Sequence, residues 1–249
     1  MIKLSAVVTC FNNEQTIGKC IKSLSFADEI VVLDSFSTDN TLSLLKQQNC
    51  MIHQQQFKGF SQQKQDAINL ASHDWIILLD SDEYLTIQAQ QSIKQWLNSE
   101  PLADAYHLPR REWVFWQWSH PWTHMNRFVR LFNRSRACVS QDMVHESIIC
   151  TGKTVAFNAI IKHYGETSIT VKLEKINRYS QLAAKQKFQQ GKRVYPVKLI
   201  FYPMWYFFKQ YFIRRQIFNG WAGLVNAVLN SQYAFLKYAK LYELQKNKN

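Results

Sequence analysis

Short runs of apolar residues alternate along the first hundred residues with segments in which apolar residues recur every three or four positions. The runs occupy residues 3–10, 29–33, 50–53 and 75–79, and the helical spacing occupies residues 12–24, 39–45 and 62–71. An apolar run predicts a buried strand, and the helical spacing predicts an amphipathic helix. Asn12 and Asn13 are predicted to cap the first helix and Asp39 the second. Strands that alternate with helices predict a parallel sheet with right-handed crossovers.

Acidic residues follow two of the predicted strands. The fourth strand is followed by Asp80, Asp82 and Glu83, and the second ends at Asp34. In open α/β sheets, ligands bind outside the carboxyl ends of the strands, where carboxylates can share a hard cation with nucleotide phosphates. An Asp-x-Asp at this place indicates a sugar-nucleotide site, whereas a lone Asp-x-Asp is more often a solvated turn that caps the next helix.

Several blocks of the sequence together resemble a known family. Four of them are VVTCFNNE at 7–14, ADEIVVLDSFSTDNT at 27–41, GFSQQK at 59–64 and LDSDE at 79–83. In their order and spacing they resemble the family 2 glycosyltransferases of GT-A fold. Further blocks, RFVRLF at 127–132, VHE at 144–146, LEKINRYS at 173–180 and FLKYAKL at 235–241, resemble the bacterial lipopolysaccharide-core β-glucosyltransferase branch. The resemblance covers nearly the whole chain.

The resemblance implies a fold and a domain organisation. The fold expected is α/β of GT-A type, a nucleotide-binding, Rossmann-like mixed sheet flanked by helices, with a C-terminal helical appendage that associates with membranes. Residues 1–165 would form the catalytic domain, in which residues 1–100 bind the nucleotide sugar and residues 101–165 form the acceptor side. Residues 166–249 would form the C-terminal helical region.

The resemblance also implies roles for residues near the first two strand ends. Asp34 would accept hydrogen bonds from the uracil edge or the ribose of a UDP-sugar. Many relatives carry a second acid after it, whereas this chain has Ser35, so one contact is expected to be weaker or made by a hydroxyl. Thr9, Asn12 and Glu14 would line the nucleotide pocket. Glu14 equally fits a first-turn acid that complements the helix dipole.

The diphosphate and a metal ion would be bound by residues of the later blocks. Lys64 would meet the diphosphate from the third helix, and Arg130 would clamp a phosphate, although each residue type is more often solvated at such positions. Asp82 is predicted to be the direct ligand of Mg²⁺ or Mn²⁺, with Asp80 binding ribose or a metal-bound water and Ser81 lining the same site. Oxygen ligands and a diphosphate favour those ions over zinc.

One further carboxylate is needed for the reaction that the resemblance implies. A metal ion can take the place of the general acid of a glycoside hydrolase, because charge develops on the leaving diphosphate. A base must then remove the acceptor hydroxyl proton as the oxygen attacks the far face of the anomeric carbon, which inverts an α-linked donor to a β product. Glu146 is predicted to be this base, with Asp142 as the second candidate. Alternatively, Glu146 pairs with a nearby arginine.

Composition and charge bear on where the protein acts. The five cysteines form no C-x-x-C pair and lie mostly in apolar runs, which fits reduced core thiols in the cytoplasm. The first apolar run is too short and wrongly flanked for a signal peptide. The net charge of +12 fits attraction to an acidic surface.

Two aromatic segments are open to two interpretations each. The first contains tryptophans at 113, 116, 118 and 122, around a loop predicted by Pro121, and forms either an acceptor platform or, as we expect, core. The second, residues 199–208, is flanked by cations at 198, 209, 214 and 215 and is too short to span a bilayer. It is predicted to lie on the inner face of the cytoplasmic membrane, where a lipid-anchored oligosaccharide is presented. The alternative is a helix packed on the catalytic domain.

Together these features predict a hexosyltransferase. The resemblance implies UDP-glucose as donor and an inner-core heptose, or the neighbouring Kdo region, as acceptor. Another cell-surface glycan or lipid acceptor, and a non-catalytic membrane or nucleic-acid-binding protein, are the alternatives. Nucleic acid is not expected as a partner, because the cations flank an apolar block and form no stripe with a reading motif. A dinucleotide oxidoreductase is disfavoured because the first turn lacks Gly-x-Gly-x-x-Gly.

Overall fold

The structure is a computed structural model, which describes residues 2–140 and 147–247. The chain forms two compact units. Unit 1 comprises Met1–Arg111 and Met125–Tyr164, and unit 2 comprises Glu112–His124 and Gly165–Asn249. The functional division of the chain at residue 165 stays a prediction.

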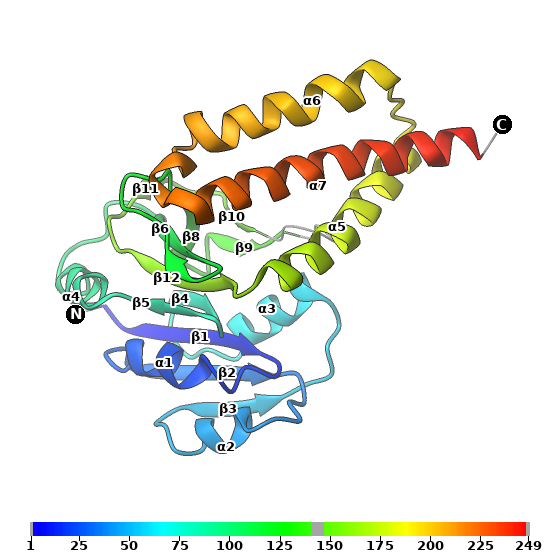
Figure 1. Ribbon diagram of the computed structural model, residues 1–249. Coiled ribbons are helices and arrows are strands. Elements are labelled where there is room, and N and C mark those ends of the chain that lie inside the picture. The colour runs from blue at the N-terminus through cyan, green and yellow to red at the C-terminus, as the bar shows by residue number, and fades with distance from the viewer. Residues whose placement is uncertain (1, 141–146, 248–249) are drawn as a thin grey trace. The chain divides into compact units, whose positions relative to one another are not determined.

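Unit 1 begins with the alternation of strands and helices that the sequence predicts. Its first elements are β1 Leu4–Cys10, α1 Ile17–Ser23, β2 Glu29–Asp34, α2 Thr41–Leu45, β3 Met51–Gln54, α3 Phe60–Asn69 and β4 Trp75–Asp80. The four strands are parallel and lie in the order β3, β2, β1, β4 (Figure 1). The parallel sheet is therefore confirmed.

The sheet becomes mixed beyond β4. The following elements are β5 Glu83–Leu85, α4 Ile87–Trp96, β6 Ala105–Val114, β8 Asn126–Asn133, β9 Ala137–Val139, β10 Ile148–Cys150, β11 Thr154–Ala156 and β12 Ile161–Glu166. The sheet continues from β4 in the order β8, β6, β12, β5, and β8 runs antiparallel to β4. This arrangement confirms the expected fold, a mixed sheet flanked by helices.

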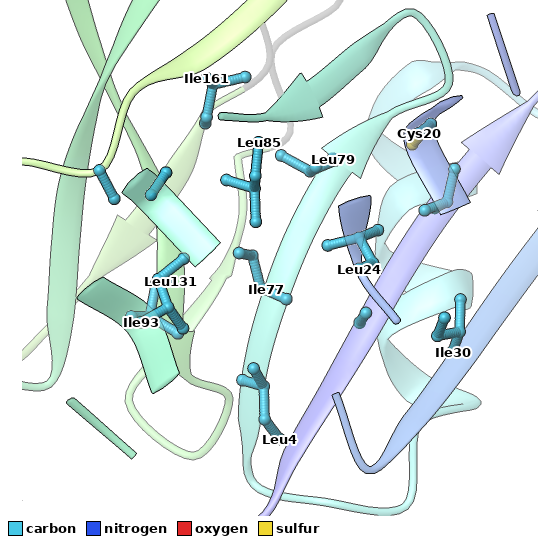
Figure 2. Packing of buried hydrophobic residues seen from close by; sticks show 14 of the residues in the cluster. Leu4, Cys20, Leu24, Ile30, Ile77, Leu79, Leu85, Ile93, Leu131 and Ile161 are labelled. Carbon is cyan, nitrogen blue, oxygen red and sulfur yellow. The ribbon is translucent and has the colours of Figure 1, made fainter. Parts of the chain in front are cut away.

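The core lies on both faces of the sheet because the central strands are apolar at nearly every position. On β1, Ala6 and Val8 join one buried cluster, and Val7 joins the other. Figure 2 shows the first cluster, in which Leu79 of β4 and Leu24, at the end of α1, are among the buried side chains. Strand side chains alternate between faces, so a continuous apolar run supplies two cores at once.

Local predictions at the helix starts were less accurate. The helix α1 begins at Ile17, with Thr16 at its N-cap and no acid in its first turn, so the predicted Asn12 and Asn13 caps and a first-turn Glu14 are wrong. Asn12 has a left-handed φ of 50°, and its side-chain oxygen accepts a hydrogen bond from the Thr38 backbone N–H at 2.8 Å. These residues connect two loops and do not cap a helix.

Unit 2 is mainly helical. It contains β7 Gln117–Trp118, α5 Ile169–Gln189, α6 Pro196–Phe208, a π-helical turn Lys209–Ile213, a 3-10 turn Gln216–Asn219 and α7 Gly220–Lys246. The long helix α7 packs against both α5 and α6 (Figure 1). Among the residues that the structure describes, no helix combines the length and the apolar character needed to cross a membrane.

The structure decides several alternatives about aromatic residues and cysteines. No residue of α6 is fully buried, although Leu199 and Tyr202 pack in part against a buried cluster of unit 2. Trp116 and Trp122 are exposed, which contradicts the expected core role for these two tryptophans. All five cysteines are free, but Cys138 is exposed and is therefore not a core thiol.

Candidate active site

Three strands of unit 1 bring their carboxyl ends together at one edge of the sheet. In the strand register, Cys10 at the end of β1 lies opposite Asp34 of β2, and Thr9 lies opposite Asp80 of β4. Ligands of such sheets bind at this edge. The structure thus collects Thr9, Asp34 and Asp80, which sequence reasoning assigned to one site, although their roles stay predictions.

A network of charged side chains surrounds Asp80. Its Oδ1 lies 2.7 Å from Lys64 Nζ, and its Oδ2 accepts a hydrogen bond from Arg130 Nη2 at 2.8 Å. The same Arg130 nitrogen donates to Glu83 Oε1 at 2.7 Å, and Arg110 Nη1 donates to that oxygen at 3.0 Å. Glu83 Oε2 in turn accepts the backbone N–H of Asp80 at 3.1 Å. Residues from α3, β4, β5, β6 and β8 therefore meet in one network.

The opposite charges in this network shift the pKa values of the groups that they surround. Burial alone would raise the pKa of Asp80, but the charges of Lys64 and Arg130 hold it well below its ordinary value. Burial would lower the pKa of Arg130, but Glu83 and Asp80 raise it above its ordinary range. Arg110 adds a third cation to this network, where it pairs with the carboxylate of Glu83.

Asp82 has a different environment from Asp80. Its Oδ2 lies 3.3 Å from His163 Nε2, and its side chain is 33% exposed. Ser81, between the two acids, donates its hydroxyl to Asn13 Oδ1 at 2.6 Å. Asp82 is thus the carboxylate whose oxygens are not paired with Lys64 or Arg130.

The donor set around Asp82 fits one kind of metal ion. Within residues 2–140 and 147–247, no group of three His, Cys, Asp or Glu side chains is placed to hold a metal. A zinc site normally takes four protein ligands, or three at a catalytic centre. Mg²⁺, in contrast, is usually bound by one or two carboxylates together with substrate phosphates and water. Asp82, with Asp80 beside it, fits the second pattern.

Asp34 is fully buried and already supplied with hydrogen-bond donors. It accepts the Ser37 backbone N–H and Gln54 Nε2, both at 3.0 Å, and the thiol of Cys10 at 3.4 Å. Burial and the charge of Asp34 raise the pKa of the Cys10 thiol, so this thiol stays protonated and acts as a donor. The backbone N–H of Ser35 donates to the Cys10 carbonyl at 2.9 Å. Asp34 thereby fixes the loop after β2, and a direct contact with the nucleoside stays a prediction.

Glu14 links two loops at this edge. Its Oε2 accepts the backbone N–H of Asn40 at 3.0 Å, and its own backbone N–H donates to Asp39 Oδ2 at 3.1 Å. Asp39 Oδ1 also accepts the Thr41 N–H, at the start of α2, at 3.0 Å. Glu14 therefore holds the first two strand-end loops together, and the nucleotide contact predicted for it stays untested.

Sequence reasoning assigned no role to four residues that the structure places here, namely Glu83, Arg110, His163 and Gln54. Glu83 belongs to the recognised LDSDE block, but its burial follows from β5 pairing with β12, a contact between distant segments. Arg110 arrives from β6 through antiparallel pairing with β8, opposite Asn126. The predicted bases Glu146 and Asp142 lie outside the described residues.

The fold, together with the charged site at the strand ends, can be compared with the models of known protein families. Residues 5–165 match the model of glycosyl transferase family 2. The chain belongs to this family of glycosyltransferases.

The chain is similar to relatives along almost its whole length. It is 31% identical to the lipopolysaccharide core biosynthesis glycosyltransferase LpsC of Rhizobium meliloti, over 97% of this chain and 93% of the relative. It is also 31% identical to an uncharacterized glycosyltransferase of Rickettsia felis, over 100% of this chain and 93% of the relative. Among solved structures, S. aureus TarS in complex with UDP matches with a TM-score of 0.49 and 14% identity, over 100% of this chain and 92% of that one.

Proposed function

We propose that the protein is an inverting, metal-dependent glycosyltransferase that moves a hexose, glucose from UDP-glucose, to an inner-core sugar of lipopolysaccharide or lipooligosaccharide. The observation that carries this proposal is the charged network of Lys64, Asp80 and Arg130 beside the more open carboxylate of Asp82. The similarity to LpsC supports the acceptor class.

The donor would be bound along the carboxyl edge of the sheet. Lys64 and Arg130 would bind the diphosphate, and the carboxylates of Asp80 and Glu83 would balance their two charges until the donor arrives. The nucleoside would be lined by Thr9, Asn12, Glu14, Asp34 and Ser35, with Ser81 on the same edge. Mg²⁺ or Mn²⁺ held by Asp82, with Asp80, would neutralise charge on the leaving diphosphate.

The acceptor hydroxyl would lose its proton to a carboxylate while its oxygen attacks the anomeric carbon. Glu146 is the first candidate for this base and Asp142 the second, since each carries an oxygen able to accept the proton. No second carboxylate is required at the leaving group, because the diphosphate departs as a stabilised anion. The proposed reaction therefore needs one carboxylate, whereas glycoside hydrolysis uses a pair of carboxyl groups.

We further propose that residues 166–249 hold the enzyme on the inner face of the cytoplasmic membrane, next to its lipid-anchored acceptor. The support is the exposure of α6, in which Ile200, Phe201, Met204 and Trp205 all face solvent. Monomeric soluble proteins rarely expose contiguous apolar patches of this kind, and such patches commonly mark a membrane or partner surface.

A direct transfer assay tests the proposed reaction. Purified protein would be incubated with labelled UDP-glucose, UDP-galactose or UDP-GlcNAc, with Mg²⁺ or Mn²⁺, and with lipopolysaccharide truncated to its inner core. We expect transfer from UDP-glucose that depends on the inner-core sugars, with Asp82→Ala as the inactive control. Transfer to another surface glycan alone would keep the enzyme class and replace the acceptor. If the protein transfers no sugar to any acceptor and also binds none of these donors, the non-catalytic alternative would be favoured.

A further inference from the structure

Three lysines from three helices of unit 2 converge on one tyrosine ring. The Nζ atoms of Lys187 on α5, Lys198 on α6 and Lys237 on α7 lie 5.9, 4.5 and 4.9 Å from the ring centroid of Tyr238. Lys198 and Lys237 also lie 5.8 and 5.5 Å from the ring centroid of Tyr202. The two tyrosine rings pack edge to face with their centroids 4.9 Å apart, so the lysines gather around one aromatic pair.

The positive charge of this cluster is not balanced by a neighbouring carboxylate. Across the described parts of the chain, none of the three lysines forms an ion pair with an acid. Burial lowers the pKa of Lys237, and the charges of Lys187 and Lys198 lower it further. Burial likewise lowers the pKa of Lys187, with Lys192 and Lys198 adding to the effect. The fold thus holds like charges close together, which an incoming anion would relieve.

A hollow in the same unit adjoins the lysine cluster. It has a volume of about 510 Å³, and its lining includes Lys198 and Tyr202 of the cluster together with Arg193, Phe201 and Trp205. Phe201 and Trp205 are largely exposed to solvent. The hollow therefore combines cations with apolar aromatic walls that no described part of the protein covers.

We propose that Lys187, Lys198 and Lys237 form, with Arg193 and the adjoining hollow, a binding site for the phosphate headgroup of an anionic membrane lipid. The cations match the phosphate, and Phe201 and Trp205 match the apolar part of an amphiphile. A free phosphate would leave the aromatic walls in water, so the lipid satisfies both halves of the site. The inference rests on the proposed membrane attachment and adds to it a specific requirement for headgroup charge.

Vesicle sedimentation tests this site. The wild-type protein and a Lys187→Gln/Lys198→Gln/Lys237→Gln variant would be mixed with two kinds of vesicle. One is neutral phosphatidylcholine, and the other contains about 30 mol percent of the anionic lipid phosphatidylglycerol. A matched variant, Lys22→Gln/Lys46→Gln/Lys153→Gln, removes the same charge from exposed lysines of unit 1. Each lysine near an anionic surface is worth about fivefold in binding, so the cluster variant should bind anionic vesicles roughly 100-fold more weakly.

The outcomes separate this site from the other proposals. A loss limited to the cluster variant, with cooperative unfolding retained, supports the site; the melting temperature should change only modestly, because relief of the repulsion offsets the lost contacts of the ammonium groups with the two tyrosine rings. Equal losses in both triple variants, or no loss, would overturn it. Inorganic phosphate that binds the wild type in the absence of vesicles, with no preference for phosphatidylglycerol, would also overturn the lipid assignment. Binding of UDP-glucose, measured on the same samples, reports on the proposed function independently.

Discussion

Glu83 and Arg130 form a buried ion pair, in which Glu83 Oε1 accepts a hydrogen bond from Arg130 Nη2 at 2.7 Å and the carboxylate side chain has no exposed surface. Through its other oxygen, Glu83 also accepts the backbone N–H of Asp80. Glu83 therefore orients the Arg130 guanidinium and the Asp80 backbone, which both belong to the diphosphate-binding end of the proposed site. Glu83 is a positioning residue, since it acts through Arg130 and Asp80.

Glu83→Gln keeps the shape of the side chain and removes its charge. We expect it to destabilise the protein by about 3 kcal/mol, because a buried arginine loses one of its two carboxylate partners. Urea unfolding would measure the change. Asp28→Asn is the control, because it breaks an exposed pair with Lys3 and should cost less than about 1 kcal/mol. Equal costs for the two variants would show that Glu83 does not stabilise Arg130.

Asp80 and Asp82 should respond differently to substitution. Asp80→Asn removes the charge that faces Lys64 and Arg130, so we expect both a lower melting temperature and a loss of transfer activity. Asp82→Ala should leave the melting temperature within about 2 °C of the wild type, because its side chain is partly exposed, and should abolish transfer. Full transfer by Asp82→Ala in the presence of EDTA would contradict the metal assignment.

The sequence predicted the framework of the site better than its contacts. The apolar run Trp75–Leu79 is short and bounded by polar residues, which favours a buried strand, so β4 and the acids at its end were found from the pattern alone. The partners of Asp80 are Lys64 of α3 and Arg130 of β8, which lie 16 and 50 residues away along the chain, and no local pattern reports such contacts. The α1 start was misplaced because the side chains of Asn12 and Asn13 accept hydrogen bonds from residues of the neighbouring loops, Thr38 and Ser81.

The stability of the protein should depend on Asp80 in acid. Its folded-state pKa lies below its ordinary value of 3.8, so the unfolded chain binds the proton first as the pH falls. The stabilising contribution is complete above pH 3.8 and is lost progressively below it. Urea unfolding between pH 7 and pH 3 should show a steeper loss of stability below that point for the wild type than for Asp80→Asn. Parallel curves would show that Asp80 is not held in its charged form by Lys64 and Arg130.

Glu146→Gln tests the predicted base. If Glu146 accepts the acceptor proton, the substitution should lower kcat by about two to four orders of magnitude, while binding of UDP-glucose barely changes. Asp142→Asn serves as the matched comparison, and the larger loss of kcat identifies the base. A near-normal rate in both variants would move the role to a different residue.

Trp205 and Phe208 provide the sharpest test of membrane attachment, because their rings stack 5.8 Å apart on α6 while remaining 53% and 46% exposed. Trp205→Ser/Phe208→Ser should lower binding to anionic vesicles by at least about tenfold, since each ring contributes roughly 1.5 kcal/mol or more on leaving water. Its melting temperature should match the wild type. Ile176→Ser, in a buried cluster of unit 2, should instead lower the melting temperature.

Because salt screens charges but does not weaken apolar insertion, high salt should release only part of the wild-type protein from vesicles. Unchanged vesicle binding together with a lowered melting temperature in the double variant would show that these aromatics stabilise the fold and do not contact the membrane.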